Sequence, residues 1–180
     1  MIGVLVSGEG SNLQALLDAG LPIVAVASNN RGVRGLERAA AAGIEAGVFP
    51  LEEYDDRSAR DAAMAAWLVE RHVELVVLAG YMHLLTRPFL ERFPDRIVNV
   101  HPSLLPAFPG AHAVDEQLSA RVTESGATVH LVDEGVDSGR ILRQERVPVV
   151  AGDTPESLHE RIKAVEHRML PEVVRELCAR

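Results

Sequence analysis

The sequence alternates short apolar runs with segments of helical periodicity, and this alternation constrains the fold more than any other feature. One run, Leu75–Ala79, contains no polar residue, which is typical of a central parallel strand buried on both faces. Strands that alternate with helices build right-handed βαβ units around a parallel sheet. The strands predicted in the first half cover residues 2–6, 22–27, 46–49, 75–79 and 97–101.

Helical spacing of apolar residues fills most of the gaps between these runs. We expect a polar loop at residues 51–56, and we expect Pro171 to kink or restart the last helix because proline lacks a backbone N–H. The predicted helices cover residues 13–19, 35–42, 58–71, 88–93, 113–123 and 155–169.

The second half carries two further strand patterns, at residues 127–132 and 141–150, with no long helix between them. This arrangement favours a mixed sheet in that half. We therefore predict the α/β class: an open, mostly parallel twisted sheet with helices on both faces, Rossmann-like, with a mixed second half. The length of 180 residues suits a single domain over residues 1–180.

Composition excludes several classes of protein. The formal net charge is -8, which disfavours nucleic acid as a main partner. The apolar start lacks the basic region of a signal peptide, and no apolar run reaches the ~18 residues that span a bilayer. The one cysteine excludes an intramolecular disulfide framework. We expect a cytoplasmic protein that acts without a membrane.

Asn99 and His101 form the first candidate site. They lie two residues apart at the end of a predicted strand, so their side chains should point to the same face. An amide can stabilise an oxyanion and an imidazole can move a proton near neutral pH, which suggests acyl or carbonyl chemistry. The alternative is a polar strand end satisfied by local hydrogen bonds. The prolines and Ser103 in residues 102–106 would fix the backbone behind the pair.

The glycine-rich turn Ser7–Asn12 forms the second candidate site. Glycines before a helix let backbone N–H groups approach an anion, as a phosphomonoester requires. Leu13 stands where the dinucleotide fingerprint needs its last glycine, and the lysine of a Walker A loop is missing. The alternative is an ordinary tight turn in which Ser11 caps the helix.

A third candidate is the acidic turn Asp133–Gly139, in which Asp137 lies between glycines. Close to His101, Asp137 would favour the charged imidazole and order a water between them. The alternative is a solvated acidic turn. His130, in the preceding strand, and Thr128 could line the same site. The remaining histidines match no zinc template, so we expect no metal.

These stretches, in this order, resemble the phosphoribosylglycinamide formyltransferase family of folate-dependent enzymes. The eight-residue string from Asn99 to Pro106, together with the spaced Asp137, is the specific part of the resemblance. The match extends over nearly the whole chain. It includes residues 3–14, 78–82, 99–106, 109–110, 126–130, 137–139 and 147–149.

The resemblance implies transfer of a formyl group from 10-formyltetrahydrofolate, as co-substrate, to the amine of glycinamide ribonucleotide in purine synthesis. Asn99 and protonated His101 would stabilise the oxyanion, and Asp137 would help to move the proton through water. Glu166 would meet the amino end of the substrate. Its phosphate would be held by Gly10, Ser11 and Asn12.

The resemblance also implies a folate pocket. Arg57 matches an arginine that contacts the folate. Asn99, one of the implied catalytic residues, would also contact the folate. His83 stands where many relatives carry arginine, so its side-chain contact does not carry over directly. The pterin would be lined, largely through backbone, by Met82, His83, Leu84 and Leu85.

Three other functions are alternatives. A methionyl-tRNA formyltransferase would need a further carboxyl-terminal domain and basic surface, and a formyltetrahydrofolate hydrolase would normally carry an amino-terminal regulatory domain. A non-enzymatic nucleotide-binding module would have no use for positioned Asn99, His101 and Asp137. We expect small-molecule substrates as partners and a monomer or weak homodimer.

Overall fold

The computed structural model describes residues 1–179, and the chain divides into two compact units. The first unit is Met1–Val98 and the second begins at Asn99. Strand β5 (Ile97–His101) starts in the first unit and ends in the second. The other elements of the first unit are β1 (Ile2–Val6), α1 (Ser11–Asp18), β2 (Ile23–Ser28), α2 (Arg34–Ala41), β3 (Glu45–Val48), the 3-10 turn η1 (Leu51–Glu53), α3 (Arg57–Glu70), β4 (Leu75–Leu78) and α4 (Arg87–Leu90).

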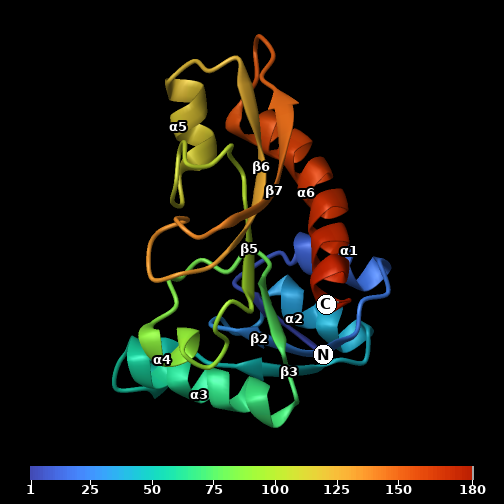
Figure 1. Ribbon diagram of the computed structural model, residues 1–180, viewed down its shortest axis with the longest axis vertical. Coiled ribbons are helices and arrows are strands. Elements are labelled where there is room, and N and C mark those ends of the chain that lie inside the picture. The colour runs from blue at the N-terminus through green and yellow to red at the C-terminus, as the bar shows by residue number, and fades with distance from the viewer. Residues whose placement is uncertain (180) are drawn as a thin grey trace. The chain divides into compact units, whose positions relative to one another are not determined.

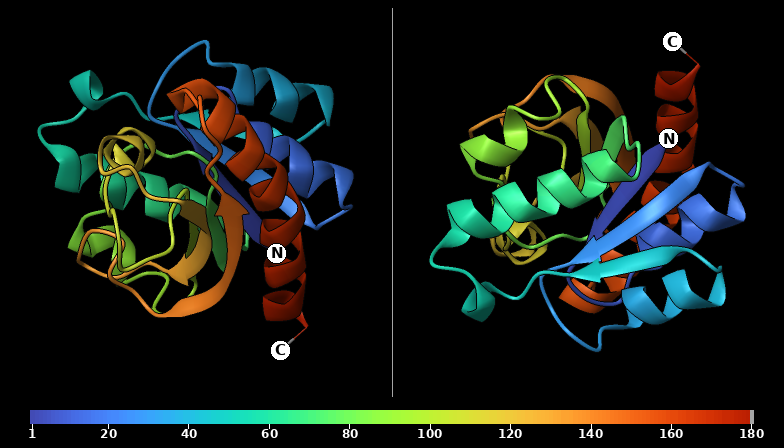
Figure 2. Two further views of the ribbon diagram at one scale, coloured as in Figure 1. Left: turned by 90° about the horizontal axis from the view of Figure 1, so that it is seen from above. Right: turned by 90° about the horizontal axis from the view of Figure 1, so that it is seen from below.

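The first unit is built on a parallel sheet with strand order β3-β2-β1-β4, and the start of β5 follows beside β4. The Val76 N–H donates to the Arg96 carbonyl at 2.8 Å, just before β5. Right-handed crossovers in opposite directions along the sheet place α1 and α2 on one face and α3 on the other (Figure 2). All five residues of β1 are buried, because both faces of this central strand are covered.

The second unit contains the end of β5, then α5 (Ala113–Ser119), β6 (Glu124–Leu131), β7 (Ile141–Pro148) and α6 (Pro155–Cys178). Strands β6 and β7 pair antiparallel, with Glu124 opposite Pro148, so the second half is mixed as predicted. Helix α6 packs along both strands (Figure 1). Its buried stripe includes Leu158, Ile162 and Met169.

Strand β7 is the last strand of its sheet and carries several charged side chains. Arg143 Nη1 lies 3.0 Å from Glu172 Oε2, and Arg143 Nη2 lies 2.6 Å from Glu176 Oε1, both on α6. In the opposite sense, Arg168 on α6 forms an ion pair with Glu145 on β7. These ion pairs connect the outer strand of the unit to its long helix.

Helix α6 corrects one prediction. We expected Pro171 to kink or restart the helix near Met169, but α6 continues through Pro171 to Cys178. Proline removes one helical hydrogen bond, yet Leu170, Pro171 and Val174 are all buried, so packing against the unit outweighs the lost bond. Thr154 and Ser157 start the helix with a reciprocal capping box.

Several boundaries also differ from prediction; α4 ends at Leu90, not at residue 93, and β7 ends at Pro148, not at residue 150. Helix α5 ends at Ser119, not at residue 123, because Arg121 takes a left-handed backbone conformation with φ 54°. Strand β6 starts three residues early, at Glu124, where pairing with β7 overrides the polar sequence. Part of the expected loop at residues 51–56 forms η1.

The predicted α/β class is confirmed, with seven strands in the described part of the chain. None of the helices in residues 1–179 has the length and apolar character that a bilayer-spanning helix requires. The prediction of one domain over residues 1–180 stays a prediction.

Candidate active site

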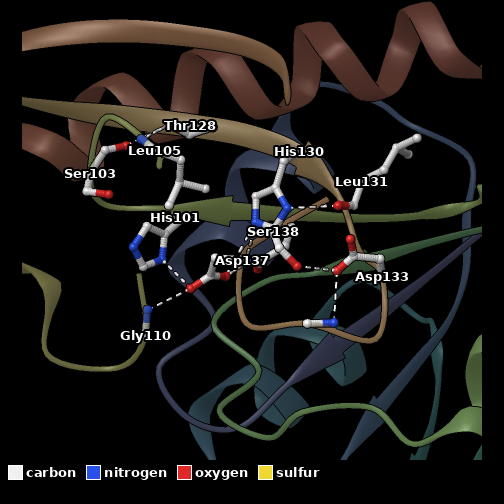
Figure 3. A network of polar contacts seen from close by, with 12 residues as sticks. His101, Ser103, Leu105, Gly110, Thr128, His130, Leu131, Asp133, Asp137 and Ser138 are labelled. Carbon is white, nitrogen blue, oxygen red and sulfur yellow. Dashed lines mark hydrogen bonds and ion pairs between the residues drawn. The ribbon is translucent and has the colours of Figure 1, made fainter. Parts of the chain in front are cut away.

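The carboxylate of Asp137 is the centre of a polar cluster in the second unit (Figure 3). Its Oδ2 lies 3.3 Å from His101 Nδ1 and accepts the Gly110 N–H at 2.8 Å. Its Oδ1 accepts the Asn99 amide at 3.3 Å and lies 3.4 Å from His130 Nε2. The Asp137 side chain is 14% exposed, so the carboxylate keeps some access to solvent. The contact with His101 is direct, whereas the sequence suggested a bridging water.

Strand geometry explains how Asn99 and His101 reach the same carboxylate. They lie two residues apart on β5, so both side chains project from one face of the strand. Asp137 approaches from the turn between β6 and β7, where its backbone is left-handed with φ 50°. Aspartate tolerates this conformation better than most residues.

The two neighbours of the His101 ring suit an imidazolium. The Nδ1 atom faces the Asp137 carboxylate, and Nε2 lies 2.7 Å from the Phe108 carbonyl oxygen. Both oxygens can only accept hydrogen bonds, so a doubly protonated ring satisfies both. Phe108 has a left-handed backbone, φ 55°, in the loop that follows β5. Each ring nitrogen of His101 therefore faces an oxygen that can accept its proton, and Nε2 is the nitrogen farther from Asp137.

Asp137 is ionised over the whole neutral range. Burial by itself would raise the pKa of Asp137. The hydrogen bonds from His130 and the Gly110 N–H, with the charges of His101 and His130, outweigh burial and lower this pKa to about 2. The cluster thus holds a permanent carboxylate between two imidazoles.

His130 links the Asn99 amide to the cluster. Its Nδ1–H donates to the Leu131 carbonyl at 2.8 Å, so in the neutral ring Nε2 carries the lone pair. That lone pair accepts from the Asn99 amide at 3.2 Å. In the protonated ring, Nε2 instead donates to Asp137 Oδ1. The protonation state of His130 therefore decides whether the Asn99 amide donates to both His130 and Asp137 or to Asp137 alone.

The loop after β5 is held by buried hydrogen bonds. The fully buried Thr128 hydroxyl donates to the Ser103 carbonyl at 2.6 Å and accepts the Leu105 N–H at 3.1 Å. A Cβ on Gly126 would lie 2.4 Å from Leu104 Cδ2, so this strand position needs glycine. Thr128, which we expected to line the site, therefore braces the loop that brings the Phe108 carbonyl to His101.

The glycine-rich turn lies in the first unit, where Gly10 is the N-cap residue of α1 with φ 69°. A Cβ on Gly10 would lie 2.7 Å from the Cα of Gly35, so only glycine fits this close approach. Ser11 and Asn12 are the first residues of the helix, and no side chain caps it. The alternative in which Ser11 is the N-cap is therefore wrong.

The predicted folate-binding residues also lie in the first unit. Met82 and Leu84 are 64% and 52% exposed, whereas Leu85 is buried. Arg57, the first residue of α3, donates from Nη2 to the Leu84 carbonyl. Burial, with the charges of Arg60 and Arg57, lowers the pKa of His83, which favours its neutral form at neutral pH.

A family model described as formyl transferase matches residues 1–174. The chain belongs to the formyl transferase family. The resemblance noted from the motifs is thereby confirmed. Within residues 1–179, this formyl transferase has no group of three or more His, Cys, Asp or Glu side chains arranged to hold a metal ion.

Individual relatives agree with this assignment. The phosphoribosylglycinamide formyltransferase of Mycobacterium tuberculosis is 47% identical over 172 residues, which are 93% of this chain and 80% of that protein. The trifunctional purine biosynthetic protein adenosine-3 of Drosophila pseudoobscura pseudoobscura is 47% identical over 94% of this chain. The match covers only 13% of the length of that trifunctional relative.

Solved structures share the fold of this formyl transferase. Glycinamide ribonucleotide transformylase 1 from Symbiobacterium toebii has a TM-score of 0.95 and 49% identity, over 97% of this chain and 85% of that one. The phosphoribosylglycinamide formyltransferase from Streptococcus pneumoniae has a TM-score of 0.94 and 41% identity, over 98% and 97% of the two chains.

Sequence reasoning found the side chains of the formyl transferase cluster but missed its backbone groups. Asn99, His101, His130 and Asp137 lie together, as the motifs suggested. The Phe108 carbonyl and the Gly110 N–H were not predicted. The prolines of residues 102–110 signal a fixed loop, but no residue type signals which backbone group points inward.

Glu166, predicted to meet the substrate amine, is 4% exposed on α6.

Proposed function

We propose that this formyl transferase moves a formyl group from 10-formyltetrahydrofolate to the amine of glycinamide ribonucleotide. The products are formylglycinamide ribonucleotide and tetrahydrofolate, a step of de novo purine biosynthesis. The observation that carries the proposal is the contact of His101, Asn99 and His130 with one ionised carboxylate, Asp137, in a member of this family.

In the first step the substrate amine attacks the formyl carbon. A carbon–nitrogen bond forms, and the formyl oxygen takes up negative charge. His101 Nε2–H, which otherwise donates to the Phe108 carbonyl, redirects its proton toward this oxygen, and the Asn99 amide provides a second donor. Donors of this kind act where charge develops in the transition state.

In the second step the bond between the formyl carbon and N10 of the folate breaks. The nitrogen that attacked must lose a proton, and N10 must gain one. Asp137, ionised at neutral pH, accepts the proton through a water and returns it to N10, so the proton count is unchanged over the cycle. Asp137 also contacts His101 Nδ1 directly, at 3.3 Å, and so orients the ring.

The binding roles follow the residues that match the family motifs. Gly10, Ser11 and Asn12 hold the phosphate at the start of α1, where backbone N–H groups are available. Glu166 meets the amino end of the substrate. The folate is contacted by Asn99, Arg57, Met82, His83, Leu84 and Leu85.

The same proposal covers partners and location. The partners are the two small-molecule substrates, with no nucleic acid and no membrane, and the protein is a monomer or a weak homodimer in the cytoplasm. No metal takes part in the reaction. The acidic net charge of -8 supports the absence of nucleic acid from the partners.

The test mixes the purified protein with glycinamide ribonucleotide and 10-formyltetrahydrofolate and follows tetrahydrofolate spectroscopically and the formylated product by mass spectrometry. Stoichiometric amounts of both products are expected. Tetrahydrofolate formed without the amine would indicate a hydrolase. Formylation of methionyl-tRNA in preference to the ribonucleotide would indicate the other formyl transferase activity. No consumption of the donor would favour a binding module.

A further inference from the structure

The Gly80–Thr86 segment follows β4 and starts with Gly80, whose carbonyl accepts the Ser7 N–H at 3.3 Å. Beyond Gly80 it is attached to the rest of the first unit at three points. The Met82 N–H donates to the Ser7 hydroxyl at 2.9 Å, and the Leu84 carbonyl accepts from Arg57. The Thr86 N–H and hydroxyl both donate to Asp61 Oδ2, at 2.8 and 2.9 Å. Between these points, Met82 and Leu84 are held outward and exposed. The segment is thus a preformed apolar surface fixed from behind.

Asp61 is the most unusual of the three attachments because it is a fully buried charge on α3. Its Oδ1 accepts from Arg60 Nε and Nη2, at 3.0 and 2.7 Å, while Oδ2 accepts from the Thr86 N–H and hydroxyl. Both side chains of the ion pair are 0% exposed. Thr86 is the N-cap residue of α4, yet its hydroxyl does not cap that helix. The hydroxyl is committed to Asp61 instead.

Stability alone does not account for this arrangement. A buried ion pair loses hydration that its mutual attraction repays only in part, and apolar residues of similar volume are often at least as stable. Among the described residues, Arg60 Nη1 and the nearby Tyr81 hydroxyl are buried without a hydrogen-bond partner, which adds to the cost. What the pair does provide is a fixed acceptor for both donors of Thr86.

We propose that Asp61, with Arg60 as its charge partner, is a positioning residue for the folate: it fixes the Gly80–Thr86 segment in the conformation that binds the formyl donor. The inference rests on the proposed function, because that function makes Met82–Leu85 the folate-binding stretch. Asp61 itself touches no substrate. It acts through Thr86, and its effect falls on donor binding and not on the chemical step.

The experiment compares Thr86→Val with Thr86→Ser in steady-state kinetics and in amide hydrogen exchange of the ligand-free protein. Valine removes the hydroxyl donor at nearly constant volume and leaves the Arg60–Asp61 pair intact, whereas serine keeps the donor. We expect Thr86→Val to raise KM for 10-formyltetrahydrofolate about five- to tenfold, with kcat and KM for the ribonucleotide within twofold. Amides of residues 82–86 should exchange faster. Thr86→Ser should behave like the wild type in both measurements.

Asp61→Asn tests the acceptor directly and should show the same pattern with a larger rise in KM for the donor. If Asp61→Asn does not fold, the kinetics and hydrogen exchange of Thr86→Val alone test the inference. An unchanged KM for the donor in Thr86→Val, or an equal rise in KM for both substrates, overturns the inference. If the wild-type protein consumes no 10-formyltetrahydrofolate, the proposed function is refuted. The positioning role is tested separately by hydrogen exchange, and equal exchange of residues 82–86 in all variants refutes it.

Discussion

The two units of the chain carry site residues of different chemical kinds. The first unit offers a glycine backbone at Gly10 and a fully buried ion pair between Arg60 and Asp61. The second unit gathers two imidazoles around Asp137, which keeps 14% of its side-chain surface exposed. Fixed charges that are fully buried can hold a segment in place. A carboxylate that contacts imidazoles near solvent can also exchange protons.

This difference predicts a division of labour that kinetics can test. Substitutions in the first unit should change KM for one substrate, because they alter how a ligand is held. Substitutions in the cluster of the second unit should change kcat, because they remove groups that act on the transition state. A first-unit variant that lowers kcat, or a cluster variant that changes only KM, would show that the two units share these roles.

Asp137→Ala should have the largest effect on turnover. The change removes the carboxylate that contacts both imidazoles, and we expect kcat to fall about 10³-fold with little change in either KM. Circular dichroism should show that the fold survives. Near-normal turnover would refute the assignment of Asp137 as a catalytic group.

Asn99→Ala should reduce kcat by about 10²-fold, the lower end of the range for loss of one oxyanion donor. Since Asp137 and His101 remain in contact, the dependence of kcat on pH should keep its shape. The measurement is a pH profile of kcat for wild type and variant. A rise in KM for the ribonucleotide with unchanged kcat would instead make Asn99 a binding residue.

The lowered pKa of Asp137 makes a prediction for stability. The folded pKa of about 2 lies below the ordinary 3.8, so ionised Asp137 stabilises the fold above pH 4, and this contribution is lost as the pH falls from about 4 to about 2. We expect it to reach about 2 kcal/mol at neutral pH. Urea unfolding of wild type and Asp137→Asn should therefore give a difference that shrinks toward pH 2. A difference independent of pH would contradict this account.

Gly10→Ala tests the first unit against a control in the same turn. The new Cβ would clash with Gly35 and would require a strained backbone, so we expect about a tenfold rise in KM for the ribonucleotide. At Gly8 a Cβ meets no atom within 4 Å, and Gly8→Ala should stay within twofold of wild type. Equal effects at both positions would show that the close approach of Gly10 is not what matters.

Arg146→Ala should have the smallest effect. Arg146 Nη1 lies 3.0 Å from Glu124 Oε2 across β6 and β7, but the Arg146 side chain is 76% exposed. Exposed pairs contribute less than about 1 kcal/mol, and this residue lies outside both candidate sites. We expect unchanged kcat and both KM values and a barely altered unfolding midpoint in urea. A clear loss of activity would extend the functional surface to β7.

The sequence predicted the parts of this molecule that depend on local pattern. Continuous apolar runs identified β1 and β4, and the spacing of Asn99 and His101 on one strand identified them as a candidate pair. These features follow from strand periodicity, which needs no knowledge of the fold. The acidic turn made Asp137 a candidate, and the resemblance to a family grouped it with His101. No local pattern predicts that the two residues lie close together.

The parts that sequence did not predict depend on tertiary contacts. The Phe108 carbonyl and the Gly110 N–H are backbone groups, which every residue has. The residue types therefore do not predict that these two groups contact His101 and Asp137. The burial of Arg60 has no local signal, because charged side chains are rarely fully buried. Pro171 looked like a helix end, but the packing of its neighbours keeps α6 continuous.

The charged outer strand β7 has a consequence for how the protein behaves at high concentration. An unpaired strand edge can template the addition of another chain, and alternating charges with a terminal proline are ways in which natural sheets prevent this. Arg143 and Glu145 are engaged by α6, and Pro148 lacks the N–H that an added strand would need. Replacing these charges with threonine or valine would turn the edge into an aggregation site while leaving the Asp137 cluster unaltered. β7 is therefore the strand to protect in any engineered or truncated form of this enzyme.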